Sequence, residues 1–355
     1  MKHIVLTGGG TAGHVTPNIA LISSLQKLGY TISYIGSHDG IEKKLIKDIH
    51  IPYYGISSGK LCRYFNLKNF SDPFRVLKGI GEAKQLMQEL NPNVVFSKGG
   101  FVSVPVVLAA KSKKIPVIIH ESDISPGLAN KICIPAASIV CCNFPETLTK
   151  LPKKKAIVTG NPIRQELMFG NKLTAMKLCN FTAKKPVLMV IGGSLGSVVI
   201  NDAIRRLLSE LLKDFQVIHL CGKSNLDPLL DRMEGYAQFE YLTKELADLF
   251  SLADVFISRA GANTICEIIS LAKPNLLIPL SEKASRGDQI LNARSFEKRG
   301  YSMVLKEEEL TPESLMKSVH QLYANRETFI AAMNNSNYTN SINRILSLIQ
   351  EYEHQ

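Results

Sequence analysis

Short hydrophobic runs alternate with helix-like patterns along nearly the whole chain of 355 residues. Runs of strand length separated by amphipathic stretches predict parallel strands joined by helices, the α/β class. In the first half of the chain the predicted strands are 3–8, 31–36, 93–98, 116–121 and 138–143. In the second half they are 186–193, 215–222, 254–261, 274–281 and 301–305.

Two helices are predicted directly after glycine-rich segments, each from a stripe of apolar residues. The first stripe, which Gly29 ends, consists of Ile19, Ile22, Leu25 and Leu28. The second consists of Ile200, Ile204, Leu207, Leu208 and Leu211. The order strand, glycine loop, helix thus occurs twice without sequence identity at a fixed period, which indicates a duplicated fold and not a solenoid.

The pattern lapses at residues 150–164, KLPKKKAIVTGNPIR, which are rich in Lys, Pro and Gly. We therefore expect two Rossmann-like, doubly wound domains that face each other across a cleft, with residues 1–161 in the first and 162–337 in the second. In such sheets ligands bind beyond the carboxyl ends of the strands, where the glycine loops lie.

Composition excludes several classes of protein. A hydrophobic content of 45% and a charged content of 21% are typical of a folded soluble protein. We expect no signal peptide, and no apolar stretch approaches the ~20 residues of a membrane span. The seven cysteines are scattered without a C-x-x-C pair, which favours buried free thiols in a reducing cytoplasm.

The net charge of +11 predicts an acidic partner: nucleic acid, an anionic membrane surface or a phosphorylated substrate. An aromatic content of 7% without Trp, and no basic run interleaved with aromatics, weaken the nucleic-acid option.

The first glycine loop, TGGGTAGHVTP at 7–17, is open to four interpretations. Gly8, Gly10 and Gly13 fit a dinucleotide loop, but the next strand does not end in the acid that would hold a ribose. A P-loop would need Lys and Ser or Thr where His14 and Val15 stand. A tight turn would need glycine only for steric reasons. A surface that brings sugars and phosphates close to main-chain N–H groups accounts for this loop together with SKGGFVSVP and VIGGSLGS.

The loop VIGGSLGS is the strongest candidate for a diphosphate site, because Gly192 and Gly193 let the main chain approach and Ser194 supplies a hydroxyl. The helix that follows contributes the positive end of its dipole. No D-x-D occurs in the sequence, so we expect no metal clamp and no cofactor. Arg164 would then help to neutralise the leaving group.

Together these motifs resemble the MurG family, the peripheral membrane N-acetylglucosaminyltransferases of peptidoglycan synthesis. The resemblance runs from Lys2 to about Gly300 and rests on TGGGTAGHVTP, FSKGGFVSVP, HESDISPGLANK, TGNPIR, VIGGSLGS, SRAGANTICEI and GDQILNA, in that order. It implies a glycosyltransferase fold of the B type whose closing helix, about 338–355, packs back on the first domain.

The resemblance also implies the reaction and its place. UDP-N-acetylglucosamine would donate its sugar to the 4-hydroxyl of the N-acetylmuramoyl unit of lipid I, giving lipid II and UDP with inversion at the anomeric carbon. The enzyme would work at the cytoplasmic face of the bacterial membrane, in cell wall biogenesis, with cell-wall and division proteins as further candidate partners.

The family's donor-site positions carry over residue by residue. Glu267 would accept hydrogen bonds from the ribose diol and shares a helix face with Thr264. Backbone atoms at Leu242 would read the uracil edge, and Gln289 would hold hydroxyls of the sugar. The positions that would border the transferred sugar are Thr11, Ala12 and Gly13, and those on the nucleotide side are Arg164 and Ser194. Asp123 replaces the Asn of many members, and a carboxylate only accepts hydrogen bonds where an amide also donates.

The acceptor hydroxyl must lose a proton, so a general base is expected. His14 lies on the first glycine loop at a predicted helix start, where the dipole disfavours the imidazolium form. His14 is therefore our candidate base. Orienting the acceptor diphosphate, or bonding to the loop, is the alternative role for His14, and Asp123 and Glu121 are rival bases.

A basic and apolar segment, GKLCRYFNLKNFSDPFRVLKG at 59–79, predicts docking onto anionic lipid. Its apolar members are Phe65, Leu67, Phe70, Phe74 and Leu77, and its basic members are Lys60, Arg63, Lys68, Arg75 and Lys78. Lys111, Lys113 and Lys114 would extend the basic rim. The alternative is an amphipathic helix with its apolar face in the core.

Other functions stay open at this point. Another UDP-sugar enzyme of the same fold, a lipid glycosyltransferase or a UDP-N-acetylglucosamine epimerase, is the nearest alternative, and HESDISPGLANK favours the MurG family over both. A nicotinamide oxidoreductase lacks its ribose acid. A non-catalytic division scaffold would have no use for His14, Arg164 and Gln289 together.

Overall fold

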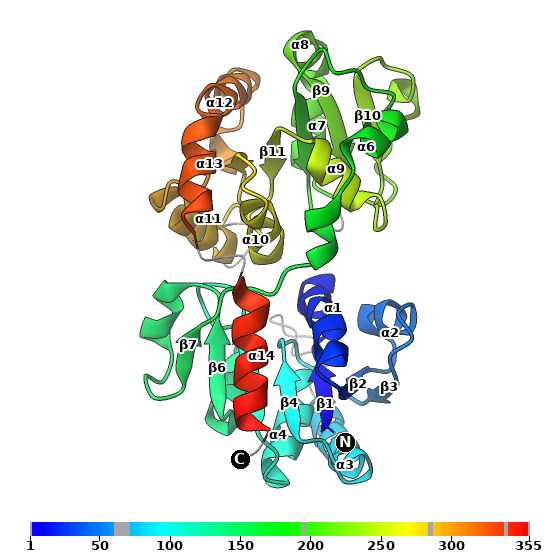
Figure 1. Ribbon diagram of the computed structural model, residues 1–355, viewed down its shortest axis with the longest axis vertical. Helices are drawn as coiled ribbons and strands as arrows, with labels where there is room; N and C mark the ends of the chain where they lie inside the picture. Colours follow the sequence, from blue (N-terminus) through cyan, green and yellow to red (C-terminus); the bar gives the residue numbers. More distant parts are fainter. Residues whose placement is uncertain (1, 60–71, 194–195, 283–286, 337–339, 354–355) are drawn as a thin grey trace. The chain divides into compact units, whose positions relative to one another are not determined.

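The structure is a computed structural model that describes residues 2–59, 72–193, 196–282, 287–336 and 340–353. The chain divides into two compact units, Met1–Arg164 with Thr339–Gln355, and Gln165–Tyr338. Each unit is built around one parallel β-sheet with helices on both faces (Figure 1).

The first sheet has seven strands in the order β3-β2-β1-β4-β5-β6-β7. Their bounds are β1 (Lys2–Thr7), β2 (Tyr30–Ser37), β3 (Tyr53–Ile56), β4 (Val94–Ser97), β5 (Val117–Glu121), β6 (Ile139–Cys142) and β7 (Ala156–Val158). Thr7 at the end of β1 pairs in register with Ser97 at the end of β4. The loops that follow these two strands therefore start at the same level of the sheet edge.

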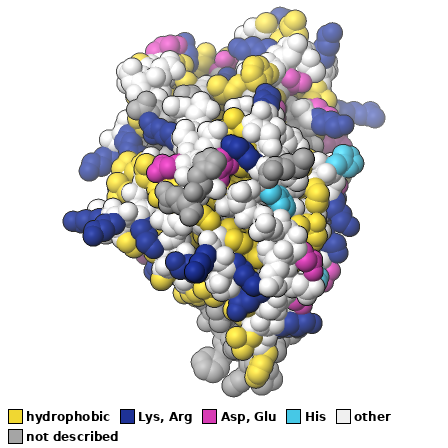
Figure 2. Space-filling model, turned by 60° about the horizontal axis from the view of Figure 1, so that its bottom comes forward, with side chains coloured by type: hydrophobic (Ala, Val, Ile, Leu, Met, Phe, Trp, Pro, Cys, Tyr) yellow, Lys and Arg dark blue, Asp and Glu magenta, His cyan; other side chains and the backbone are white. Residues whose placement is uncertain are grey.

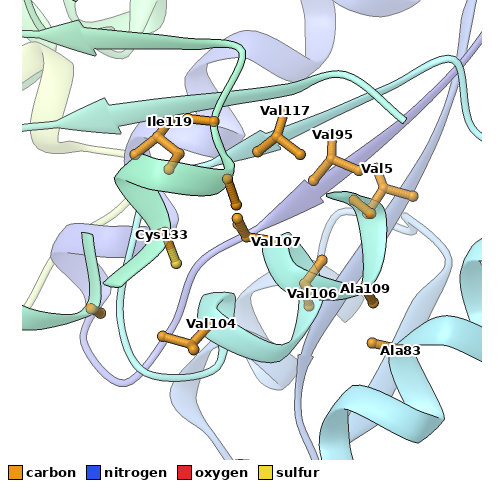
Figure 3. Packing of buried hydrophobic residues seen from close by; sticks show 14 of the residues in the cluster. Val5, Ala83, Val95, Val104, Val106, Val107, Ala109, Val117, Ile119 and Cys133 are labelled. Atoms are coloured by element: carbon orange, nitrogen blue, oxygen red, sulfur yellow. The ribbon is translucent and has the colours of Figure 1, made fainter. Parts of the chain in front are cut away.

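Two hydrophobic cores sandwich the first sheet because successive strand residues point to opposite faces. Val5 packs on one face with residues of α3 (Asp72–Leu90), α4 (Ser103–Ser112) and α5 (Leu128–Cys133), as Figure 3 shows. Ile4 and Leu6 pack on the other face, under α1 (Ala12–Lys27) and α14 (Ser341–Tyr352), while α2 (Ile41–Lys47) follows β2. The closing helix α14 thus belongs to the core of the first unit (Figure 1).

The second sheet has six strands in the order β10-β9-β8-β11-β12-β13. Their bounds are β8 (Val187–Ile191), β9 (Gln216–Leu220), β10 (Tyr236–Phe239), β11 (Val255–Ser258), β12 (Asn275–Leu277) and β13 (Met303–Val304). The helices of this unit are α6 (Lys172–Cys179), α7 (Val198–Arg206), α8 (Leu208–Asp214), α9 (Leu246–Leu252), α10 (Ala262–Ser270), α11 (Asp288–Lys298), α12 (Pro312–Ala324) and α13 (Arg326–Asn334). Leu188 and Met189 point into cores on opposite faces.

The predicted α/β class with parallel sheets is confirmed, and each predicted strand is present. The sequence patterns missed β3, β7 and β10, all of them edge strands. The second apolar stripe was wrong as one helix, because the main chain leaves the helical conformation at Leu207 (φ −101°, ψ 3°) and the stripe divides between α7 and α8. All five stripe residues are nevertheless buried together.

In the described part of the chain, no helix is both long enough and apolar enough to cross a bilayer. Each described cysteine is buried and forms no disulfide. Cys62, with most of the predicted lipid-docking segment, lies outside the described residues.

Candidate functional site

The first glycine loop connects β1 to α1 and lies against the loop that follows β4. The Gly9 N–H donates to the Gly99 carbonyl at 3.3 Å. A Cβ on Gly100 would come within 2.2 Å of the Gly9 carbonyl oxygen, and one on Gly8 within 2.5 Å of the His14 carbonyl oxygen. Steric necessity therefore explains Gly8 and Gly100. Gly10 differs, since it has φ +85° and open space where a Cβ would stand.

His14 lies in the first turn of α1, half-buried, with its ring fixed by the neighbouring loop. Nδ1 is 3.0 Å from the Lys98 carbonyl oxygen. A carbonyl only accepts, so Nδ1 carries the proton and Nε2 has a free lone pair. Burial lowers the pKa of His14 below 6.5, and the Lys98 charge lowers it further. The hydrogen bond to the Lys98 carbonyl and the negative charges of Asp123 and Glu42 oppose this shift. The ring is therefore neutral near pH 7, with the tautomer that a base acting through Nε2 requires.

The rival carboxylates on the loop after β5 differ in their surroundings. Glu121 is buried, and its oxygens accept hydrogen bonds from the Asp123 N–H (3.0 Å), the Gly127 N–H (3.0 Å) and the Asn130 amide (2.8 Å). Burial, and next the charge of Asp123, raise the pKa of Glu121. Glu121 thus organises its loop, while Asp123 lies close enough to His14 to affect its pKa.

Lys98 is a buried cation at the same sheet edge that the sequence patterns did not single out. Only 1% of its surface is exposed. Its Nζ lies 2.7 Å from His120 Nδ1, 2.7 Å from Ser122 Oγ and 2.9 Å from Asn161 Oδ1. His120 Nε2 lies 2.8 Å from the Gly160 carbonyl and must donate to it, so Nδ1 accepts from the ammonium. Burial holds the pKa of His120 well below 6.5.

The second unit contains a pocket of about 360 Å³ beside its own glycine loop. A Cβ on Gly192 would come within 2.4 Å of the Ser197 nitrogen, and one on Gly196 within 2.0 Å of the Cys221 carbonyl oxygen. Gly193 has φ +96° and no heavy atom within 4 Å of a Cβ position. The described lining residues are Gly192, Gly193, Gly196, Ser197, Val198, Val199, Ser258, Arg259, Gly261, Thr264, Leu280, Gln289 and Glu307.

Arg259 places a fixed positive charge in the wall of this pocket. Its Nε and Nη2 donate to Ser197 Oγ at 3.1 and 2.7 Å, and Nη1 donates to the Ile278 carbonyl at 3.1 Å. Its guanidinium also forms an ion pair with Glu307. Ser197 is the N-cap of α7, and its Oγ accepts from the Ile200 N–H at 3.4 Å. The helix start and the buried guanidinium favour an anionic ligand, while the Glu307 carboxylate offsets part of the guanidinium charge.

Comparisons with known proteins agree on the family of this chain. The family model of the glycosyltransferase family 28 N-terminal domain matches residues 4–141, and the model of the family 28 C-terminal domain matches residues 187–350. A Lachnoclostridium phytofermentans protein, named UDP-N-acetylglucosamine–N-acetylmuramyl-(pentapeptide) pyrophosphoryl-undecaprenol N-acetylglucosamine transferase, is 62% identical over 351 residues, 99% of each chain. A Clostridium botulinum (strain Kyoto) protein of the same name is 59% identical over 352 residues, again 99% of each chain.

The crystal structure of Acinetobacter baumannii MurG superposes with a TM-score of 0.76 at 26% identity, covering 99% of this chain and 100% of that one. The chain belongs to the MurG family of glycosyltransferases. The expected glycosyltransferase fold of the B type is thereby confirmed.

The positions carried over from the MurG family divide between the two units. Thr11, Ala12, Gly13, His14, Asp123 and Arg164 belong to the first unit, and Leu242, Thr264, Glu267 and Gln289 to the second. In the first unit, Thr11 is exposed at the start of α1, and Arg164 is half-buried at the end of the unit. Ser194 lies outside the described residues.

In the second unit, Thr264 and Gln289 line the pocket. The Gln289 Oε1 accepts from the Ala260 N–H at 3.2 Å and the Leu280 N–H at 3.1 Å, which orients its amide nitrogen as the remaining donor. Glu267 is buried one turn after Thr264 on α10, and Leu242 packs partly buried against the core. Among the described side chains of both units, no group of three or more His, Cys, Asp and Glu could hold a metal ion.

Sequence reasoning missed three charged residues at these MurG-family loops: Glu42, Lys98 and Arg259. Lys98 and Arg259 lie inside two motifs of the family resemblance, FSKGGFVSVP and SRAGANTICEI, so position within a glycine-rich motif was an available signal. No sequence signal pointed to Glu42, because the pattern GIEKKLIK predicts an exposed, charged helix.

Proposed function

We propose that the protein transfers N-acetylglucosamine from UDP-N-acetylglucosamine to the 4-hydroxyl of the N-acetylmuramoyl unit of lipid I. The products are lipid II and UDP, and the anomeric carbon is inverted in one displacement. The observation that carries this proposal is the 62% identity, over 99% of both chains, to a protein named for that transfer. Identity of that extent along the whole chain favours this reaction over an epimerase or another lipid glycosyltransferase.

The pocket of the second unit supports a role in donor binding. Gly193 leaves room for a diphosphate to approach the main chain, and the start of α7 with the Arg259 guanidinium supplies positive potential. The Gln289 amide nitrogen would donate to a sugar hydroxyl. Glu267 would accept from the ribose, Leu242 would read the uracil edge, and Arg164 and Ser194 would assist at the diphosphate. Donor binding would require no metal ion.

The first unit supports a role in deprotonating the acceptor. His14 is neutral, its Nδ1–H is held by Lys98, and its Nε2 lone pair can take the proton of the 4-hydroxyl as the sugar transfers. Thr11, Ala12 and Gly13 would border the transferred sugar, and Asp123 would stabilise the imidazolium that forms.

A transfer assay tests the reaction. The full-length protein is incubated with labelled UDP-N-acetylglucosamine and a lipid I analogue, with and without EDTA. We expect a β-1,4-linked disaccharide product and one UDP per transfer in both conditions. An epimerase would change the sugar nucleotide without the acceptor, and that result, or no disaccharide, would overturn the proposal.

We further propose peripheral binding to the cytoplasmic face of the membrane. At the start of α3, Phe74 is 75% exposed and Leu77 is 65% exposed, with the Lys78 side chain exposed beside them. These side chains point away from the core, unlike an apolar helix face that packs inward. Lys111, Lys113 and Lys114 are exposed as well, and Figure 2 shows Lys and Arg distributed among hydrophobic side chains over one face of the molecule.

Vesicle sedimentation tests the membrane proposal. Binding should increase with the fraction of anionic lipid and decrease with salt, because surface charge is screened. Phe74→Ser with Leu77→Ser should weaken binding at every lipid composition, and Leu229→Ser, which changes a 92% exposed residue of the second unit, is the matched control. Binding that ignores both lipid charge and salt would exclude the electrostatic contribution.

A further inference from the structure

A buried carboxylate, Glu42, lies directly beneath the first glycine loop. None of its surface is exposed. One oxygen accepts the Gly10 N–H at 3.1 Å, and the other accepts the N–H and Oγ–H of Ser37 at 3.0 and 2.5 Å. No cation pairs with Glu42 among the described residues. The negative charge is held in place by three donors alone.

Three glycines from two segments make room for this carboxylate. A Cβ on Gly9 would come within 2.5 Å of the carboxyl group, and one on Gly40 within 2.2 Å. A Cβ on Gly36 would come within 2.8 Å of Glu42 Cγ. A buried charge is costly unless its surroundings satisfy it, so the close fit indicates a built position for a carboxylate and not a chance burial.

The carboxylate changes what the loop can bind. The Gly10 N–H is already engaged, whereas phosphate groups bind where several main-chain N–H groups are unoccupied and the potential is positive. The charged groups that act on His14 are Glu42, Asp123 and Lys98, two negative and one positive. The positive one, Lys98, is committed to three acceptors of its own.

We propose that Glu42 makes the first glycine loop a site for neutral sugar hydroxyls and excludes the acceptor's diphosphate from it. The inference rests on the proposed transfer to a diphosphate-linked acceptor. Glu42 acts as a positioning residue: it fixes Gly10 beside His14, and its charge repels an anion that would otherwise occupy the open face of Gly10. A hydroxyl carries no net charge and binds there without this penalty.

Equilibrium dialysis with labelled inorganic pyrophosphate tests this without relying on turnover. With UDP present at saturation, the wild type should retain no pyrophosphate. Glu42→Gln, which keeps the shape and removes the charge, should gain a pyrophosphate site that UDP does not block. Glu42→Asp, which keeps the charge, is the matched control and should gain none. Pyrophosphate binding to the UDP-saturated wild type, or equal behaviour of Gln and Asp variants, would overturn the inference.

Kinetics give a second readout. In the wild type, pyrophosphate should compete with UDP-N-acetylglucosamine only, and in Glu42→Gln it should also compete with the lipid I analogue. Pyrophosphate that competes with the acceptor in an active wild type would overturn this inference alone. A wild type that makes no disaccharide would overturn the proposed function instead, while the dialysis result would still decide the binding properties of the loop.

Discussion

The two glycine loops share one kind of glycine but have oppositely charged side chains bonded at or beside them. The first loop connects β1 to α1, and the second connects β8 to α7. Each contains a glycine of positive φ with open space at its Cβ position, Gly10 in the first and Gly193 in the second. Beneath the first loop lies the Glu42 carboxylate, bonded to the Gly10 N–H. Beside the second lies the Arg259 guanidinium, bonded to the N-cap of α7.

From this difference we infer that a glycine motif determines how closely a ligand can approach, while a residue from elsewhere in the chain determines which ligand is favoured. Glu42 comes from α2, the helix after β2, and Arg259 directly follows β11. We therefore expect phosphate groups to bind at the second loop and sugar hydroxyls at the first. Variants that act on one loop should leave the ligand of the other loop unaffected.

Removal of the His14 imidazole should have the largest effect. In His14→Ala, turnover should fall by roughly 10²- to 10⁴-fold, the usual contribution of a general base. UDP-N-acetylglucosamine affinity, measured by calorimetry, should stay unchanged because the second unit is intact. His320→Ala, on helix α12 of the second unit, is the control. Turnover of His14→Ala within a few-fold of wild type would show that His14 is not the base.

The matched pair Gly193→Ala and Gly10→Ala tests the division between the loops directly. Both residues have positive φ, so each alanine should cost a similar ~1–2 kcal/mol of folding stability. Gly193→Ala should weaken UDP binding by about tenfold or more, equivalent to ~1.4 kcal/mol, whereas Gly10→Ala should leave UDP binding unchanged and raise the KM of the acceptor. Equal loss of UDP affinity in both variants would contradict the comparison.

Arg259→Lys should have a smaller effect on the second loop. Lysine keeps the charge but cannot reach Ser197 Oγ and the Ile278 carbonyl at once, because it lacks the planar fork of arginine. UDP affinity should fall a few-fold, with little change in the KM of the acceptor. Arg206→Lys, an exposed change at the other end of α7, the helix that Ser197 caps, should leave UDP affinity unchanged. A raised KM of the acceptor with unchanged UDP affinity would show that Arg259 acts on the acceptor and not on UDP.

The interior of the fold could be predicted because a buried strand such as β8 is apolar on both faces, so its hydrophobic run reveals it. The missed strands β3, β7 and β10 lie at sheet edges and carry partly exposed residues, which removes that signal. The break at Leu207 was equally hidden, because all five apolar residues of the stripe stay in one core although the helix is interrupted.

The sequence predicted the residues of the candidate site that lie in family motifs, but not the buried charge outside them. Thr264 and Gln289 were found from family positions, and the structure places both at one pocket. Glu42 could not be found, because its burial depends on glycines at 9, 36 and 40 and on the register of β1 with β2. The sequence patterns alone do not reveal that a charged residue in GIEKKLIK is fully enclosed.

The smallest expected effect concerns pH. His14 must be neutral to act, so the acidic limb of kcat/KM follows its pKa and should lie below pH 6.5 in the wild type. The Lys98 charge lowers that pKa and the Glu42 charge raises it. Lys98→Met should therefore move the limb to higher pH and Glu42→Gln to lower pH, because each substitution removes a charge that acts on the imidazole.

Opposite shifts are the diagnostic result, because loosening of the loop alone would move both variants in the same direction. Lys44→Met, which neutralises an exposed lysine of α2, is the control and should leave the limb unchanged. UDP binding to the second unit checks that each variant is folded. If Lys98→Met and Glu42→Gln shift the limb the same way, the two buried charges do not tune the pKa of His14.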